Sequence, residues 1–198
     1  MVGLMTLNDL EITLRQNMWL GEILERFEEI LLPDSWLVAG AIAQTIWNLR
    51  CEQPAEFGLK DVDLIYFDEQ DLSFEAEASQ RRVRNLFQHL PIKLDVKNEA
   101  RVHLWYEDRF GDAIKPYSSS ADAIATFPTT ATAVGVRQIR SKFECCAPFG
   151  LDDLFSLVVR PNKRQITRAI YEAKVDRWRS IWPRLTFLPW EEMIPPGQ

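Results

Sequence analysis

Hydrophobic positions change their spacing along the chain, and this spacing predicts where helices and strands lie. In the first thirty residues, leucine, methionine and phenylalanine recur every three or four positions with charged residues between them, which is the pattern of amphipathic helices. Thr6 or Asn8 can cap this segment, Gly21 can divide it into two helices, and Pro33 ends it. We therefore expect an N-terminal helical segment over residues 1–33.

Short runs of β-branched and aromatic residues alternate with helical patterns through the rest of the chain. Strand patterns fall at residues 35–39, 61–67, 92–96 and 132–139. Helical patterns fall at residues 41–50, 73–90, 99–108, 151–159 and 163–182, with a short helix between the serines at 118–120 and Phe127. This order predicts an α+β (α/β-like) fold, with a small mixed sheet flanked by helices and a helical C-terminal part over residues 150–182. We expect a single domain over residues 1–198, because a chain of this length can bury one substantial core.

Composition narrows the class of protein further. The chain has 46% hydrophobic and 26% charged residues, and its formal net charge is −6. This acidity argues against a general nucleic-acid binder, because such binding depends on lysine and arginine displacing counterions. Apolar runs are too short to cross a membrane, no secretory leader is visible, and the three cysteines are too few and too irregular for a disulfide framework or a metal motif. We therefore expect a cytoplasmic protein.

Two aspartates on one predicted strand are the first candidates for chemistry. Asp61 and Asp63 are two positions apart, so a strand places both side chains on one face. Like charges this close repel unless a cation lies between them, and oxygen ligands favour Mg²⁺ or Mn²⁺ over zinc. Asp95, on the next predicted strand, can supply a third carboxylate. The alternative is that Asp61 and Asp63 are solvated residues at the start of a strand.

A strand–glycine–helix unit precedes the aspartates. Gly40 separates the predicted strand from the predicted helix, and backbone N–H groups at such a helix start suit a phosphate. A phosphate cradle followed by paired carboxylates and a third carboxylate is more specific than any of these features alone.

The same order of motifs resembles the nucleotidyltransferase superfamily with the polymerase β-like fold. The residues that carry this resemblance are Ala39–Gly40–Ala41, Asp61–Val62–Asp63 and Leu94–Asp95–Val96. Four stretches are similar to a bacterial, mostly uncharacterised nucleotidyltransferase family: 39–48, 61–68, 98–106 and 149–162. The likeness covers residues 35–182.

This resemblance implies Mg²⁺-dependent transfer of a nucleoside monophosphate from an NTP to a hydroxyl acceptor, with release of pyrophosphate. Asp61 and Asp63 would hold two Mg²⁺ ions on the triphosphate, and Asp95 would ligate the catalytic metal and help to deprotonate the acceptor. Many members have Gly-Ser or Gly-Gly where this chain has Gly40–Ala41. Ala41 keeps its N–H but lacks a hydroxyl, and Gln44, one turn on, can supply the missing hydrogen bond.

Other polar and aromatic residues allow both a functional and a structural interpretation. Arg101 can meet a phosphate or the acceptor, or it can be a surface arginine on a helix. The tryptophans can stack on bases, although helical spacing favours core packing for three of them. A basic set can hold an anion or be a solvated face. The three tryptophans are Trp47, Trp178 and Trp182, and the basic set is Arg137, Arg140, Lys142, Lys163, Arg164 and Arg168.

A rival reading is a non-catalytic nucleotide- or partner-binding protein that retains the nucleotidyltransferase fold. Gly40–Ala41 favours it, and the presence of Asp61, Asp63 and Asp95 counts against it. A purely structural protein is disfavoured, because the paired aspartates have no nearby basic partner in sequence. The acidic chain favours a small molecule or a protein as the acceptor over a long nucleic acid.

Overall fold

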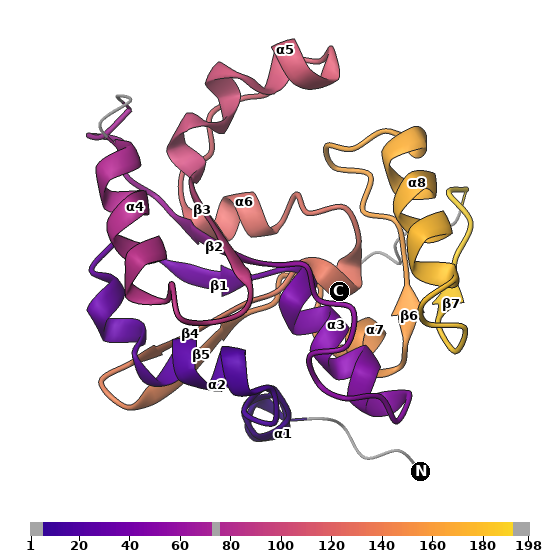
Figure 1. Ribbon diagram of the computed structural model, residues 1–198. Helices are drawn as coiled ribbons and strands as arrows, with labels where there is room; N and C mark the ends of the chain where they lie inside the picture. Colours follow the sequence, from indigo (N-terminus) through magenta and orange to yellow (C-terminus); the bar gives the residue numbers. More distant parts are fainter. Residues whose placement is uncertain (1–5, 73–75, 192–198) are drawn as a thin grey trace.

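Five strands form one mixed sheet at the centre of the protein (Figure 1). The computed structural model describes residues 6–72 and 76–191. The strands lie in the order β3-β2-β1-β4-β5, and only β2 and β3 pair in parallel. Their bounds are β1 Trp36–Val38, β2 Asp61–Tyr66, β3 Lys93–Asn98, β4 Gly135–Ile139 and β5 Lys142–Cys146. This mixed sheet, flanked by helices, confirms the α+β fold.

Helices surround the sheet, and two short strands form a second, parallel pair. The α-helices are α1 Leu7–Leu14, α2 Met18–Glu25, α3 Gly40–Arg50, α4 Ala76–Leu86, α5 Tyr106–Phe110, α6 Ser120–Ile124, α7 Asp152–Phe155 and α8 Arg168–Arg179. The 3-10 helices are η1 Phe27–Ile30, η2 Glu99–Leu104 and η3 Thr130–Thr132, and the paired short strands are β6 Val158–Val159 and β7 Thr186–Phe187. Within the described residues, no helix is long and apolar enough to cross a membrane.

The N-terminal segment is helical as expected, but it breaks at Asn17 rather than at Gly21. Thr6 caps α1 by accepting a hydrogen bond from the N–H of Asp9, whose carboxylate in turn accepts one from the N–H of Thr6. The buried Asn17 side chain caps α2 by accepting from the N–H groups of Trp19 and Leu20. A side-chain cap of this kind starts a new helix, whereas Gly21 lies inside α2.

The C-terminal helices are shorter than the sequence pattern predicts. The helix expected over residues 151–159 ends at Phe155, and the one expected from residue 163 begins at Arg168. Asn162 is fully buried, and its amide donates to the carbonyls of Ala125 and Phe127 at 2.9 and 2.8 Å. These bonds tie Asn162 to a distant loop, so the residues between α7 and α8 do not continue either helix.

A hairpin that the sequence did not indicate extends the sheet on its far side. β5 pairs with β4 around a turn at Arg140 and Ser141, both of which have positive φ (50° and 60°). Such turns usually contain asparagine or glycine, so the sequence carried no turn signal.

The two faces of the sheet have separate cores. Val62, Leu64 and Tyr66 of β2 face the main core, which also includes side chains from α1, α2, α3 and α4. Ile65 of β2 faces the other side, where it packs with Val38 and with Ile124 of α6. Since side chains alternate along a strand, Asp61 and Asp63 lie on the face of Ile65.

The three tryptophans at helical spacing confirm the core-packing interpretation. Trp47 of α3 contacts Trp178 and Trp182 edge-on, with ring centroids 5.2 and 5.5 Å apart. The indole N–H of Trp182 donates to the side-chain oxygen of Asn48 at 2.6 Å. This cluster holds α8 against α3 and thereby fixes the position of α8 in the fold.

Candidate active site

Strand pairing brings the expected residues to one place. In the parallel pair, Asp63 of β2 lies opposite Asp95 of β3, and Asp61 lies opposite Lys93. In the antiparallel pair, Asp63 lies opposite Val38, the last residue of β1. Gly40 follows two residues later and begins α3. The helix start, Asp63 and Asp95 therefore lie side by side across three adjacent strands.

A lysine that the sequence analysis did not consider bridges two of the aspartates. The ammonium of Lys97 lies 2.9 Å from Oδ2 of Asp95 and 3.4 Å from Oδ1 of Asp63. Asp63 therefore has a basic partner, which lies 34 positions away along the chain rather than near it in sequence. The signal was present in the sequence, because Lys97 is two positions after Asp95 on the same strand and so shares its face.

The charges around Lys97 shift the pKa of each group. Burial raises the pKa of Asp63, and the charges of Asp61 and Asp95 add to this rise against the opposing effect of Lys97. Burial also acts to raise the pKa of Asp95, but the hydrogen bond with Lys97 and the charges of Lys97, Lys93 and Arg84 together outweigh burial and lower it. Burial acts to lower the pKa of Lys97, and the two carboxylates reverse this so that the pKa rises. Lys97 is therefore charged at neutral pH.

The oxygen donors fit a hard divalent cation, although Lys97 lies among them. Asp61 and Asp95 both act on Asp63 to raise its pKa, and excess negative charge of this kind favours a bound cation. Carboxylate oxygens are the ligands that Mg²⁺ and Mn²⁺ prefer. Within the described residues, however, no group of three or more Asp, Glu, His or Cys side chains is arranged to hold a metal. In the described arrangement the Lys97 ammonium lies between the carboxylates of Asp63 and Asp95, where a cation shared by them would lie.

The turn before α3 has an unusual backbone. Ala39 adopts φ 59° and ψ −121°, a conformation that favours glycine, and its N–H donates to the carbonyl of Val134 at 2.9 Å. Ala39 has no polar side-chain atom with which to cap α3, so the N–H groups of the first turn are left for another acceptor. A Cβ on Gly40 would lie 3.0 Å from the side-chain nitrogen of Gln44. Gln44 therefore lies over Gly40 and Ala41 at the helix start, where an anion is favoured.

Two further ionisable groups near the aspartates were missed. Lys174 of α8 is half-buried, and burial and the charge of Arg177 lower its pKa against the opposing charges of Asp63 and Asp61. Burial raises the pKa of Glu99 to about 7, with Asp63 adding to the rise and Lys97 opposing it. The sequence indicates Lys174 only weakly. In the helical pattern it lies three residues after an apolar position, and therefore on the same face of the helix. Glu99 had none, because its burial depends on the tertiary fold.

Arg101 lies on the β3 side of the site. It belongs to η2, which begins directly after β3, and it lines a cavity of about 290 Å³ together with Asp95, Arg84 and Arg109. Its assignment as a nucleotide-binding residue remains a prediction. Asn98, which precedes η2, is structural: its amide donates to the carbonyls of Asp68 and Asp71.

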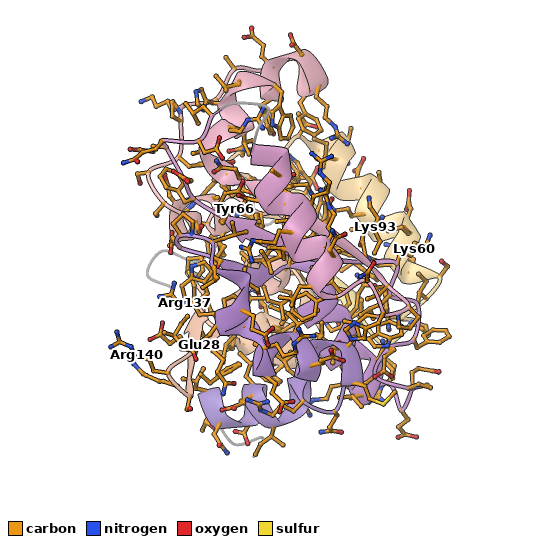
Figure 2. All side chains as sticks on the ribbon, turned by 60° about the vertical axis from the view of Figure 1, so that its left-hand side comes forward. Glu28, Lys60, Tyr66, Lys93, Arg137 and Arg140 are labelled. Atoms are coloured by element: carbon orange, nitrogen blue, oxygen red, sulfur yellow. The ribbon has the colours of Figure 1, made fainter. Side chains whose placement is uncertain are left out.

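The basic set identified in the sequence is divided between separate elements. Arg137 of β4 pairs with Glu144 at 2.9 Å and stacks 4.0 Å from the Trp36 ring, whereas Arg168 belongs to α8. Figure 2 shows Arg137 and Arg140 on one side of the molecule, and Lys60 and Lys93, which flank the aspartates in sequence, on the other. The set therefore does not form one anion-binding patch.

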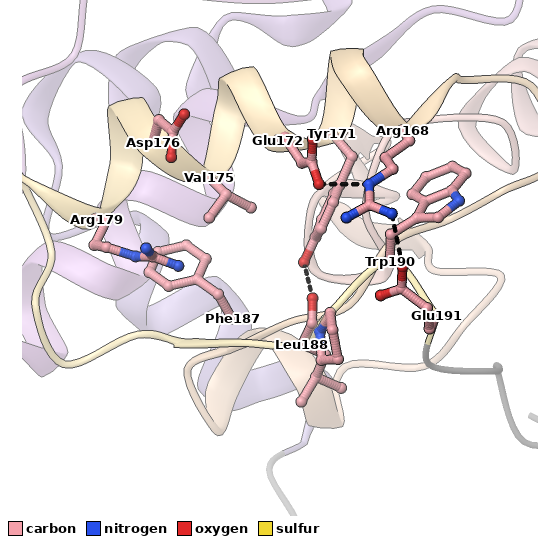
Figure 3. A pocket seen from close by; sticks show the side chains of 11 residues that line it. Arg168, Tyr171, Glu172, Val175, Asp176, Arg179, Phe187, Leu188, Trp190 and Glu191 are labelled. Atoms are coloured by element: carbon pink, nitrogen blue, oxygen red, sulfur yellow. Dashed lines mark hydrogen bonds and ion pairs between the residues drawn. The ribbon is translucent and has the colours of Figure 1, made fainter.

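A separate cavity of about 380 Å³ lies between α8 and the segment after β7 (Figure 3). Arg168 there pairs with Glu172 and Glu191 at 2.6 and 2.7 Å. The hydroxyl of Tyr171 donates to the carbonyl of Leu188 at 2.6 Å. The charge of Arg168 is therefore taken up by Glu172 and Glu191, and none of the aspartates of the candidate site lines this cavity.

Comparisons with known proteins identify the family and the fold of the chain. A family model described as nucleotidyltransferase matches residues 25–187. Among curated proteins, none matches the sequence significantly. An NMR structure described as revealing a CCA-adding enzyme head domain superposes with a TM-score of 0.74 at 27% identity, covering 92% of this chain and 95% of that one. The chain therefore belongs to a nucleotidyltransferase family and has the fold of a nucleotidyltransferase head domain.

Proposed function

We propose that the protein transfers a nucleoside monophosphate from an NTP to a hydroxyl acceptor and releases pyrophosphate, with Mg²⁺ or Mn²⁺ as cofactor. The observation that carries this proposal is the placement of Asp63 between the start of α3 and Asp95 on adjacent strands. The family supports nucleotidyl transfer in general; the donor, the metal and the acceptor are our inference.

The triphosphate would bind at the start of α3. The N–H groups of Gly40 and Ala41, which no side chain caps, and the amide of Gln44 near Gly40 would donate to an anion there. Lys174 of α8, within the field of Asp61 and Asp63, would supply positive charge to the same phosphates. This charge substitutes for the hydroxyl that Ala41 lacks.

Asp61, Asp63 and Asp95 would hold the metal, which when bound neutralises the triphosphate and polarises the α-phosphate. Asp95 also lies on the edge strand β3, two strands away from β1 and the start of α3, where it would accept the proton of the attacking hydroxyl. Its pKa is lowered, so Asp95 is ionised at neutral pH and would accept the proton only transiently before passing it to solvent. Lys97 would turn from Asp63 towards the reacting phosphates.

One observation favours the second function, a non-catalytic nucleotide- or partner-binding protein. Lys97 already pairs with both Asp63 and Asp95, so each of these carboxylates has a cationic partner without a metal. If Lys97 does not move, the fold can bind a nucleotide at α3 without transferring it.

We further propose that the protein acts in the cytoplasm, as a single nucleotidyltransferase-like domain over residues 1–198. Its three cysteines are free in the structure, and NTPs are abundant in that compartment. The acceptor proposed from composition is a small molecule or a protein rather than a long nucleic acid.

Thermal unfolding with each NTP, with and without Mg²⁺, tests the proposal without knowledge of the acceptor. A ligand at about a hundred times its Kd adds roughly 2.7 kcal/mol, which raises Tm by about 5–10 °C in a chain of this size. Asp63→Asn should abolish the Mg²⁺-dependent part of this shift, whereas the exposed Asp176→Asn on α8 should retain it. A shift with NTP that is independent of Mg²⁺ and of Asp63 would support the non-catalytic alternative.

A further inference from the structure

A basic cavity runs along the outer edge of β3, on the far side of Asp95 from α3. We name this cavity of about 290 Å³ the edge pocket, and the residues that matter for its chemistry are Arg84, Asp95, Lys97, Arg101, Trp105 and Arg109. They come from α4, β3, η2 and α5, so the pocket forms only when these four elements pack together. β3 is the last strand of the sheet, which leaves the pocket open to solvent.

Among the described residues that line the edge pocket, basic side chains outnumber carboxylates, of which Asp95 is the only one. The pocket contains three arginines and a lysine, in a chain whose net charge is −6. Lys97 is already bound to Asp95 and Asp63. Within the described residues, Arg84 bonds only the neutral Gln80, at 3.4 Å, and Arg109 lies against aromatic rings rather than a carboxylate. Neither charge is therefore consumed by an ion pair there.

An exposed aromatic side chain borders this charge. Trp105 is 37% exposed, and the guanidinium of Arg109 lies 5.9 Å from its ring centroid. Guanidinium groups bind phosphate through paired, charge-assisted hydrogen bonds, while an indole face stacks on a flat ring. The cavity volume of about 290 Å³ is just below the usual range for small-molecule sites, which favours a small ligand.

The position of the edge pocket fixes its role relative to the triphosphate. Across the sheet, the start of α3 follows β1, the paired aspartates lie on β2, Asp95 lies on β3, and the pocket lies beyond β3. In phosphoryl transfer the attacking and leaving oxygens lie roughly in line on opposite sides of the phosphorus. A pyrophosphate that leaves towards α3 therefore requires a hydroxyl that arrives from the β3 side.

We propose that the edge pocket binds the acceptor, and that the acceptor is a small hydroxyl compound that carries a phosphate group and a flat ring. This inference rests on the proposed function. Arg84 and Arg109 hold the phosphate, and Trp105 stacks on the ring. The hydroxyl oxygen forms a bond to the α-phosphorus, the bond from that phosphorus to the bridging oxygen breaks, and pyrophosphate leaves with the electron pair. The hydroxyl proton passes to Asp95 and then to solvent.

Binding of simple probes tests the pocket without any transfer reaction. Phenyl phosphate has a ring and a phosphate, and benzoate has the same ring with a carboxylate. Titration of each into the full-length protein, followed by NMR of the Trp105 indole (assigned with Trp105→Phe), should give a saturable shift with phenyl phosphate and a weaker one with benzoate. Arg109→Gln should weaken phenyl phosphate binding about tenfold, the loss of one charged hydrogen bond. The matched Arg81→Gln, on α4 but outside the pocket, should leave it unchanged.

The outcomes separate this inference from the proposed function. Arg109→Gln should keep the Mg²⁺-dependent NTP shift, and Asp63→Asn should lose that shift but keep phenyl phosphate binding. An absent Trp105 response, equal binding of benzoate, or no effect of Arg109→Gln would overturn the pocket while leaving the NTP site intact. A short RNA with a free 3′-hydroxyl is a further probe. If it binds more tightly than phenyl phosphate and its binding depends on Arg109, the small acceptor is overturned in favour of a nucleic-acid acceptor.

Discussion

Glu99 is buried next to the charged site, and its replacement by glutamine gives a sharp test of the electrostatics. The side chain is 6% exposed, and burial, together with the charge of Asp63 and against that of Lys97, raises its pKa from 4.5 to about 7. Glutamine has nearly the same shape but does not titrate. Glu99→Gln therefore removes the ionisation and leaves the packing in place.

The sign and size follow from the raised pKa. In the unfolded chain Glu99 loses its proton near pH 4.5, whereas in the folded protein it keeps the proton until about pH 7. Between these values the folded state binds more protons, so stability falls as pH rises and levels off above pH 7. The fall amounts to about 3 kcal/mol, and Glu99→Gln should lack it. Above pH 7 the variant should be more stable by up to this amount, or by about 6–12 °C in Tm.

Urea unfolding at a series of pH values from 5 to 8.5 measures this difference directly. The pKa of Asp63 is also raised, so Asp63 too makes stability fall as the pH rises. Because Asp63 is present in both proteins, its contribution cancels when the two are compared. Glu107→Gln, at an exposed position on α5, controls for the loss of one carboxylate. Parallel pH profiles for the wild type and Glu99→Gln would refute a raised pKa at Glu99.

Three other substitutions follow from the same site. Lys97→Met should lower the free energy of unfolding in the absence of metal by about 1 kcal/mol, the value of a partly exposed pair, and should increase the Tm gain from added Mg²⁺. An unchanged response to Mg²⁺ would mean that Lys97 does not compete with the metal. Lys174→Met should weaken NTP binding in calorimetry by about tenfold with Tm unchanged or raised, and equal NTP affinity would remove Lys174 from the triphosphate site. Ala39→Gly should raise stability by about 1 kcal/mol, because it relieves the positive φ, whereas Ala43→Gly inside α3 should lower it by a similar amount.

Much of the site was readable from local sequence. The two-residue period of a strand placed Asp61 and Asp63 on one face, and the apolar run after them identified the strand. The break between β1 and α3 located the helix start and Gln44. These features depend on neighbours within a few residues, so the pattern alone determines them.

Other elements were decided by distant contacts. The β4–β5 turn at Arg140 and Ser141 has no glycine or asparagine, and it forms because the paired strands complete the sheet. The start of α8 depends on Asn162 bonding to residues more than thirty positions away. A helical pattern continues through residues 163–167, but these bonds override it.

By itself, the sequence determined which side chains share a face, the alternation of strands and helices, and the acidic character of the chain. Only the tertiary structure decided that Asp63 meets Asp95, that Lys97 lies between them, that Lys174 approaches from α8, and that Glu99 is buried. The physical reason is the range of the forces involved. Backbone geometry fixes periodicity locally, whereas burial and the mutual field of charges depend on strand order, register and helix docking, which are settled by the chain as a whole.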